Sequence, residues 1–183
     1  MIKTRNLKIK IREELTAEIL RLKDINWYID SIFRPFFYEY LEYKPNSDAD
    51  KLKLKAVLVS LVNEYKINNL FKSDIRLVLK LNGENVGGIT LINSGDTPEY
   101  IEIAYWVLPE YQRRGICKDA IIKIMSALSN KYNDIKGFKL TILSNNNASL
   151  KFADKLGFKE IQREVSTVNE NIDSVTYIKY TNQ

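Results

Sequence analysis

The stretch IEIAYWVLPEYQRRGIC, residues 101–117, decides the fold of this chain. It predicts an apolar strand over 101–107, a turn that contains Gly115, and a helix, because apolar residues at 120, 121, 124, 125 and 128 follow at helical spacing. The first N–H groups of a helix have no partner within it and carry partial positive charge, so they suit a phosphate. A Cβ at position 115 would hold such a ligand away from the backbone. The turn therefore predicts an anion site, although an ordinary strand–turn–helix with a solvated arginine pair fits the same residues.

A second stretch, NNASLKFADKLGF at residues 146–158, follows the first turn and predicts a short helix that stops at Gly157. Together the two stretches resemble the two signatures of the GNAT superfamily of acetyltransferases, Q/R-x-x-G-x-G/A for coenzyme A and N-x-x-S followed by G-F. The longer stretches around the two motifs, EIAYWVLPEYQRRGI and NNASLKFADKLGF, are most similar to the branch of bacterial ribosomal-protein N-terminal-alanine acetyltransferases (RimJ/RimL type). The resemblance covers residues 99–160 and is looser over 1–98. It implies an α/β (α+β) GNAT fold, with a mixed, strongly twisted, seven-stranded sheet flanked by helices, as one domain over residues 1–183.

The composition is that of a globular protein with enough chain for a full core, since 45% of its 183 residues are hydrophobic and 28% are charged. No apolar run approaches the roughly 20 residues that span a bilayer, and the first six residues lack the apolar core of a secretory signal. The single cysteine, Cys117, rules out an internal disulfide. We therefore expect a cytoplasmic protein that does not bind a membrane.

Histidine is absent from the chain. This excludes zinc sites of the usual histidine-containing kinds, serine–histidine triads and imidazole acid–base catalysis. Any proton transfer must use carboxylates, tyrosines, the backbone or water, and we expect no metal site.

The net charge of +5 is unevenly distributed. Residues 16–43 contain five acidic and three basic side chains, a local charge of −2, which leaves +7 for the remainder. This division suits an anionic cofactor on one side and a cationic acceptor on the other, although mixed charges on solvated helices explain it equally well. We do not expect a nucleic-acid partner, because basic–aromatic alternation and zinc-finger spacing are both missing.

Hydrophobic periodicity and turn residues predict the remaining elements. We expect a strand at 7–12, a short helix from an N-cap at Thr16 to Lys23, a helix over 31–43 with Pro35 in its first turn, a helix capped by Ser47 or Asp48, a hairpin of strands 75–81 and 86–92, a strand at 100–107, a helix at 114–130, a strand at 138–143, a helix at 148–156, and strands near 158–165 and 174–180.

By resemblance, acetyl-CoA would lie with its pyrophosphate on the backbone amides of residues 113–118 and its pantetheine between the splayed parallel strands 101–107 and 138–143. The backbone near Trp106 and Val107 would then hold the thioester carbonyl. Asn146 would take the family's asparagine role beside the pantetheine arm. The residues expected to bind the cofactor are Trp106, Val107, Gln112, Arg113, Arg114, Gly115, Ile116, Cys117, Lys118, Asn146 and Ser149.

Glu102 is the best candidate for the base that takes a proton from the acceptor amine. On a strand it shares a face with Ala104 and Trp106, next to the expected thioester. The alternative is a surface glutamate paired with a lysine. Glu99 and Asp96 are weaker candidates on the preceding loop.

A different residue is the candidate for the acid that protonates the leaving thiolate. Many GNAT enzymes use a tyrosine seven residues after the motif asparagine, but Ala153 occupies that position here. The ribosomal-protein branch instead uses the serine of N-x-x-S, which is Ser149, although a serine at a helix start is also a common cap. That branch also has a glutamate where our alignment places Ser166, and Glu164 could substitute for it. We reject an acetyl-cysteine on Cys117, because its motif position faces phosphate.

Residues 24–45 would form the binding site of the acceptor amine. This segment is rich in aromatic side chains, which either belong to the helix core or line a slot for an ammonium group. The sequence leaves three functions open. The chain is an N-acetyltransferase for a primary amine on a protein N-terminus, an N-acetyltransferase for a small molecule such as a polyamine or an antibiotic, or a non-catalytic acyl-CoA sensor. We expect either a monomer or a homodimer.

Overall fold

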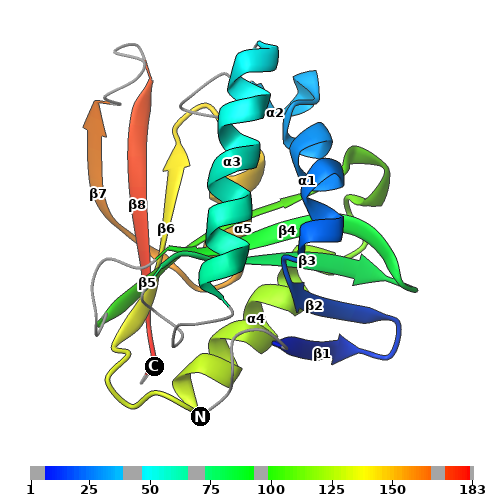
Figure 1. Cartoon of the computed structure of the whole chain (residues 1–183). Coiled ribbons are helices and arrows are strands. Elements are labelled where there is room, and N and C mark those ends of the chain that lie inside the picture. The colour runs from blue at the N-terminus through cyan, green and yellow to red at the C-terminus, as the bar shows by residue number, and fades with distance from the viewer. Residues whose placement is uncertain (1–6, 39–46, 66–72, 93–98, 166–171, 182–183) are drawn as a thin grey trace.

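An eight-stranded mixed sheet, in the order β1-β2-β3-β4-β5-β6-β8-β7, forms the centre of the molecule (Figure 1). The computed structural model describes residues 7–38, 47–65, 73–92, 99–165 and 172–181. Its strands are β1 (Lys8–Arg12), β2 (Leu15–Ile19), β3 (Ile75–Leu81), β4 (Glu84–Ile92), β5 (Tyr100–Val107), β6 (Gly137–Leu143), β7 (Lys159–Val165) and β8 (Asp173–Tyr180). Its helices are α1 (Ile25–Ile32), α2 (Pro35–Tyr38), α3 (Asp48–Glu64), α4 (Ile116–Ser129) and α5 (Asn147–Lys155), with 3-10 turns η2 (Leu22–Asp24) and η3 (Pro109–Tyr111).

Helices cover both sides of the sheet. Helices α1 and α3 lie side by side on one side, and α4 lies on the other, where it contacts β1, β2 and β5 (Figure 1). Side chains on β3, β4 and β5 alternate between these sides. We call the side toward α4 the apolar face; it carries Ile75, Leu77, Leu79, Ile89, Leu91, Ile103 and Val107. We call the side toward α1 the polar face; it carries Arg76, Lys80, Thr90, Glu102, Ala104 and Trp106.

The segment predicted as a helix from Thr16 to Lys23 is wrong, because residues 15–19 form strand β2. Leu15, Ala17 and Ile19 are at most 1% exposed, whereas the residues between them are half-buried, which is the period of a strand. Pairing of β2 with both β1 and β3 brings these three side chains into the core. The sheet consequently has eight strands rather than the expected seven.

The helix predicted over 31–43 is also wrong in its bounds. Helix α1 ends at Ile32, and Pro35 starts the separate helix α2. A proline disfavours helical backbone at the residue before it, so Arg34 becomes the break between the two helices. Residues 39–46 lie outside the described part of the chain.

The other predicted elements are confirmed within two residues at their ends. Ser47 caps α3, since its hydroxyl accepts from the Asp50 N–H and the Asp50 carboxylate accepts from the Ser47 N–H. Asn82 and Gly83 have φ values of 51° and 85°, which suit the tight turn between β3 and β4. Gly157 ends α5 with a φ of 80°. Among the described residues, no helix is long and apolar enough to cross a membrane.

Strands β5 and β6 are parallel and separate soon after they start. Their pairing covers only Tyr100–Gly137, Ile101–Phe138 and Glu102–Lys139. On its other side β5 stays paired with β4 as far as Val107. Within the described ranges, the backbone of residues 103–107 therefore has a strand edge without a partner strand, and this edge leads directly to η3 and α4. The splay expected between strands 101–107 and 138–143 is confirmed.

Candidate active site

The N-terminus of α4 presents backbone N–H groups to its surroundings. Gly115 is its N-cap residue, with a φ of 74°, and no side chain of the described residues forms a capping hydrogen bond at this end of the helix. Its carbonyl accepts the Asp119 N–H, so the N–H groups of residues 116–118 are the ones without an intrahelical acceptor. Arg113, with a φ of 59°, turns the loop before it. Consecutive outward N–H groups of this kind form a site for an anion.

The charged side chains around this helix end are arranged unequally. Arg113 and Lys118 are exposed beside it. Arg114 instead lies over the Tyr111 ring, 5.2 Å from its centroid, and donates to the Glu110 carbonyl at 3.0 Å. Asp119 in the first turn is paired with Arg12 of β1 at 2.6 Å, which offsets a negative charge close to the expected anion. Ile116 is buried, so only its backbone is available to a ligand.

The opposite end of the site lies on the polar face of β5. Glu102 is half-buried and Ala104 is exposed, although β5 is an inner strand of the sheet. In the described part of the chain Glu102 forms no ion pair, and the Nζ of its register neighbour Lys139 lies over the Tyr100 ring at 4.9 Å. The structure therefore does not support the alternative, in which Glu102 is a surface glutamate paired with a lysine. A carboxylate borders a solvent-accessible stretch of this strand.

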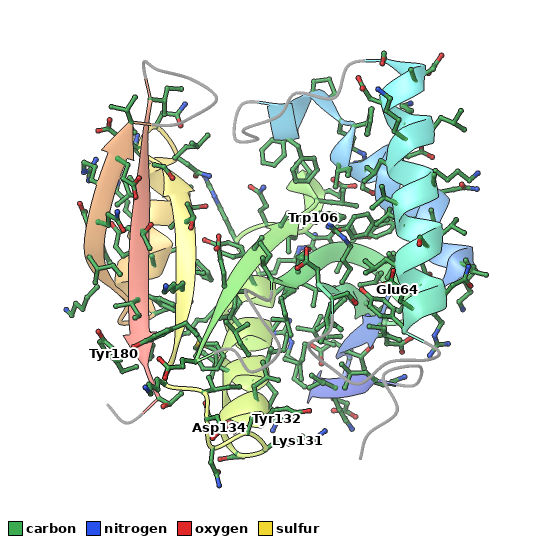
Figure 2. All side chains as sticks on the ribbon, turned by 60° about the vertical axis from the view of Figure 1, so that its left-hand side comes forward. Glu64, Trp106, Lys131, Tyr132, Asp134 and Tyr180 are labelled. Carbon is green, nitrogen blue, oxygen red and sulfur yellow. The ribbon has the colours of Figure 1, made fainter. Side chains whose placement is uncertain are left out.

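Trp106 packs into an aromatic cluster between β5 and the first helices. Figure 2 shows it between α1 and α3 on one side and strands β6 to β8 on the other. Its ring stacks on Trp27 at 5.6 Å between centroids, and meets Tyr28 and Phe37 edge-on at 5.4 and 5.2 Å. These aromatic side chains act mainly as core, and they fix the strand whose backbone would hold the thioester.

Gly88 on β4 gives the Trp106 ring its space. A Cβ at position 88 would lie 2.8 Å from the ring atoms Cε2 and Nε1. We expect Gly88→Ala to lower the free energy of unfolding by about 1–3 kcal/mol, because the ring must leave its packed position. Chemical denaturation measures this, and adding Trp106→Phe should recover part of the loss. An unchanged stability in Gly88→Ala would contradict this account.

Asn146, and not Ser149, caps helix α5. The Asn146 Oδ1 accepts the Ser149 N–H at 3.1 Å. The Ser149 hydroxyl is thus free of the capping role, and it lies beside the Tyr105 side chain, which projects from β5. Burial raises the pKa of Tyr105, and the neighbouring Ser149 opposes part of that rise. The Tyr105 hydroxyl is buried and forms no hydrogen bond of ordinary geometry within the described residues.

Cys117 is poorly suited to nucleophilic chemistry. Burial raises the pKa of its thiol to about 12, although part of the residue remains accessible. A thiol with this pKa has almost no thiolate at neutral pH. This supports our rejection of an acetyl-cysteine. No group of three metal-ligating side chains lies in the described ranges.

The sequence of residues 28–158 matches the model of the acetyltransferase (GNAT) family. The chain belongs to the GNAT family. No curated protein sequence matches it significantly. The family match confirms three expectations: the GNAT fold, an acetyltransferase activity, and acetyl-CoA as the cofactor.

Solved structures with the same fold are acetyltransferases of different kinds. One is the acetyltransferase from Salmonella typhimurium that modifies the N-terminal serine of ribosomal protein L7/L12, with 13% identity, a TM-score of 0.77, and coverage of 95% of this chain and 99% of that one. Another is the microcin C7 self-immunity acetyltransferase MccE with acetyl-CoA and AMP, with 20% identity, a TM-score of 0.75, and coverage of 94% and 95%. A third is spermidine N-acetyltransferase from Vibrio cholerae with CoA and spermine, with 17% identity, a TM-score of 0.75, and coverage of 93% and 98%.

Two residues of this GNAT site did not emerge from the sequence. Arg12 neutralises Asp119 from the far strand β1, and Arg76 lies on the polar face of β3. A signal for the second was that Arg76, like Lys80, is a charged residue within the otherwise apolar run 75–81. Asp96, Ser166 and the acidic residues Glu39 and Glu42 lie outside the described residues, and Glu164 is exposed on β7.

Proposed function

We propose that this protein is an acetyl-CoA-dependent N-acetyltransferase that moves the acetyl group directly to a primary amine. The observation that carries the proposal is the unpaired edge of β5 after Glu102, which leads to the uncapped N-terminus of α4. An extended amide-bearing arm can pair with such an edge, and a diphosphate can bind such a helix end. The residues present therefore fit acetyl-CoA, which supplies the activated acetyl group when bound.

Each part of the site has a separate binding role. The N–H groups of residues 116–118 bind the diphosphate, with Arg113 and Lys118 adding positive charge. The backbone at Trp106 and Val107 stabilises negative charge on the acetyl carbonyl oxygen. Gln112 lies at the start of this loop, with its Nε2 3.5 Å from the Val107 carbonyl. Arg114 has to turn away from Tyr111 to contribute its charge there.

Glu102 removes the proton from the amine, directly or through a water. An α-amine with a pKa near 7.8 needs only about 1 kcal/mol for deprotonation at pH 7, whereas a lysine near 10.4 needs about 4.6 kcal/mol. A single carboxylate is a sufficient base for the α-amine but a poor one for the lysine amine. This favours an α-amine or another amine of lowered pKa over a lysine side chain.

Ser149 passes a proton to the departing thiolate, giving its hydroxyl proton to the sulfur while it takes up another proton from solvent. Ala153 leaves no hydroxyl at the family's tyrosine position and is fully buried, whereas the Ser149 hydroxyl is freed by the Asn146 cap. We expect Ser149→Ala to lower kcat by about tenfold to a hundredfold, which is measured by free-thiol release. Its melting temperature should stay close to that of the wild type, because the cap remains.

Asn146→Ala is the matched comparison for that variant. It removes the cap, and we expect a loss of about 1 kcal/mol in the free energy of unfolding. If Ser149→Ala instead lost stability and kept its kcat, the hydroxyl would be structural and another group would be the acid.

The acceptor is either a protein N-terminus, as in the ribosomal-protein branch, or a small amine. The test is thiol release from acetyl-CoA with a panel of N-terminal peptides, polyamines and aminoglycosides. Acetylation of at least one class supports the proposed function. Binding of acetyl-CoA without transfer to any amine would favour a non-catalytic sensor.

A further inference from the structure

Arg76 places a positive charge on the polar face, beneath helices α1 and α3. Its guanidinium lies between the Tyr28 hydroxyl of α1 and the Thr90 hydroxyl of β4, and its Nη1 is 3.4 Å from each oxygen. Tyr28 and Thr90 are 2% and 6% exposed, so the charged group is held among buried neighbours.

Within the described part of the chain, the guanidinium has unused donors. Nε is buried and has no hydrogen-bond partner there, and no carboxylate in these ranges forms an ion pair with Arg76. Burial lowers the pKa of Arg76, but Tyr28, Tyr65 and Asp74 more than offset this effect, so the group remains charged. A desolvated cation with spare donors is unfavourable unless an anion meets it.

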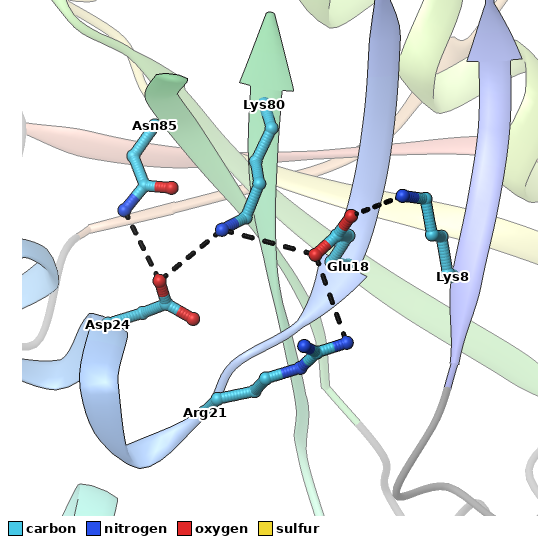
Figure 3. Close-up of polar contacts among 6 residues, drawn as sticks. All are labelled: Lys8, Glu18, Arg21, Asp24, Lys80 and Asn85. Atoms are coloured by element: carbon cyan, nitrogen blue, oxygen red, sulfur yellow. Dashed lines mark hydrogen bonds and ion pairs between the residues drawn. The ribbon is translucent and has the colours of Figure 1, made fainter. Parts of the chain in front are cut away.

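Lys80, four residues further along the same strand and face, shows how this chain treats a cation that is structural. Its Nζ lies 3.4 Å from Asp24 Oδ1 and 3.9 Å from Glu18 Oε2, with Asn85 bonded to the same Asp24 oxygen (Figure 3). Lys8 and Arg21 complete this network around Glu18 (Figure 3). Among the described residues, two carboxylates thus form ion pairs with Lys80, whereas none forms an ion pair with Arg76.

Strand register places Arg76 close to the proposed reaction centre. Arg76 pairs with Thr90, and Thr90 pairs with the exposed Ala104, so the three residues form one row across β3, β4 and β5. Neighbouring strands are about 4.8 Å apart. Because the guanidinium already reaches Thr90, it lies about one strand spacing from Ala104, and Glu102 is the next residue on the same face of β5.

We propose that Arg76 binds a carboxylate or phosphate of the acceptor, and that the substrate is a small amine with an oxyanion a few bonds from its nitrogen. The inference rests on the proposed function and names the acceptor of that site. The anion accepts from the guanidinium of Arg76, which favours two-point contact with an oxyanion. The amine then lies toward Glu102 and Ala104. A polyamine would bring only further positive charge to this arginine.

The test compares acceptors that differ only in the anion, namely alanine with alaninamide and O-phosphoethanolamine with ethanolamine, and adds spermidine. Thiol release from acetyl-CoA gives kcat/KM for each. We expect the anionic member of at least one pair to be preferred by tenfold or more, and the pair that shows this identifies carboxylate or phosphate. The amide lowers the pKa of its neighbouring amine, which favours alaninamide, so a preference for alanine is a stringent result.

Arg76→Gln should abolish the preference and leave the KM for acetyl-CoA unchanged. Arg76→Lys keeps the positive charge but loses the two-point geometry of the guanidinium, so it should retain part of the preference. The control is Arg163→Gln, an exposed arginine on β7 that pairs with Glu160, which should behave as the wild type. Calorimetric titration of alanine and O-phosphoethanolamine into the CoA-saturated protein measures binding without turnover.

The outcomes separate this inference from the proposed function. Equal kcat/KM for neutral and anionic partners, or a preference that survives Arg76→Gln, would overturn the role of Arg76 and leave acetyl transfer intact. Failure of all amines to release thiol would count against the proposed function alone, and calorimetry would then decide. Binding that depends on Arg76 supports the inference, and no binding of either anionic amine by the wild type overturns it.

Discussion

Gly115→Glu is expected to abolish measurable binding of acetyl-CoA while the protein stays folded. The new carboxylate would lie at the N-terminus of α4, where it would occupy and neutralise the N–H groups that bind the diphosphate. A Cβ at this position meets only the Asp119 carboxylate, at 3.7 Å, so there is space for the side chain. The cost to the fold is the φ of 74°, which amounts to about 1–2 kcal/mol for a residue other than glycine. Isothermal titration with acetyl-CoA measures the loss, which we expect to exceed a hundredfold.

Gly83→Glu is the matched control for this variant. Gly83 has a φ of 85° in the β3–β4 turn, and nothing lies within 4 Å of an added Cβ. It therefore carries the same backbone strain and the same added charge, but away from the α4 terminus. We expect a similar decrease in melting temperature and unchanged affinity for acetyl-CoA. Wild-type affinity in Gly115→Glu would show that the diphosphate binds elsewhere.

The contrast between β5–α4 and β2 shows where the sequence was sufficient for the fold. The apolar run 101–107, the glycine and the helical spacing after it all indicate one local structure, so no tertiary information was needed. Residues 15–19 also alternate, but the stretch is only five residues long and is followed by good helix formers. Its assignment to β2 depends on pairing with β3, some 60 residues later in the chain. Long-range pairing of this kind overrides local propensity.

The candidate site divides in the same way. Gly115 and Asn146 act on their own backbone within three or four residues, so their motifs could be recognised from spacing alone. The importance of Arg76 depends on two strand registers and on a comparison of ion pairs: in the described ranges Lys80 pairs with Asp24, and no carboxylate pairs with Arg76. A sequence identifies the charged residue, but only the folded sheet identifies which charges are compensated.

Glu102→Gln is expected to lower kcat by about a hundredfold or more, with unchanged affinity for acetyl-CoA. Glutamine keeps the size of the side chain and its place on β5, but it cannot accept the proton of the amine. The deficit should narrow as the pH rises toward the pKa of the acceptor amine, because the neutral amine then forms without a base. A rate profile from pH 6 to 10 measures this, and a deficit that is constant with pH would mean that Glu102 orients the acceptor rather than deprotonating it.

Glu99→Gln tests whether any nearby carboxylate could serve. Glu99 is exposed and its carboxylate is bonded to Lys136, whereas Glu102 is half-buried, borders the exposed Ala104 and has no ion pair among the described residues. A base must be able to approach the amine and must not be tied to a competing cation, so the two variants should differ sharply. We expect Glu99→Gln to retain the wild-type kcat. If it lost activity while Glu102→Gln kept it, the proton would leave from the start of β5 rather than from the polar face, and the acceptor would have to be placed about 10 Å further along that strand.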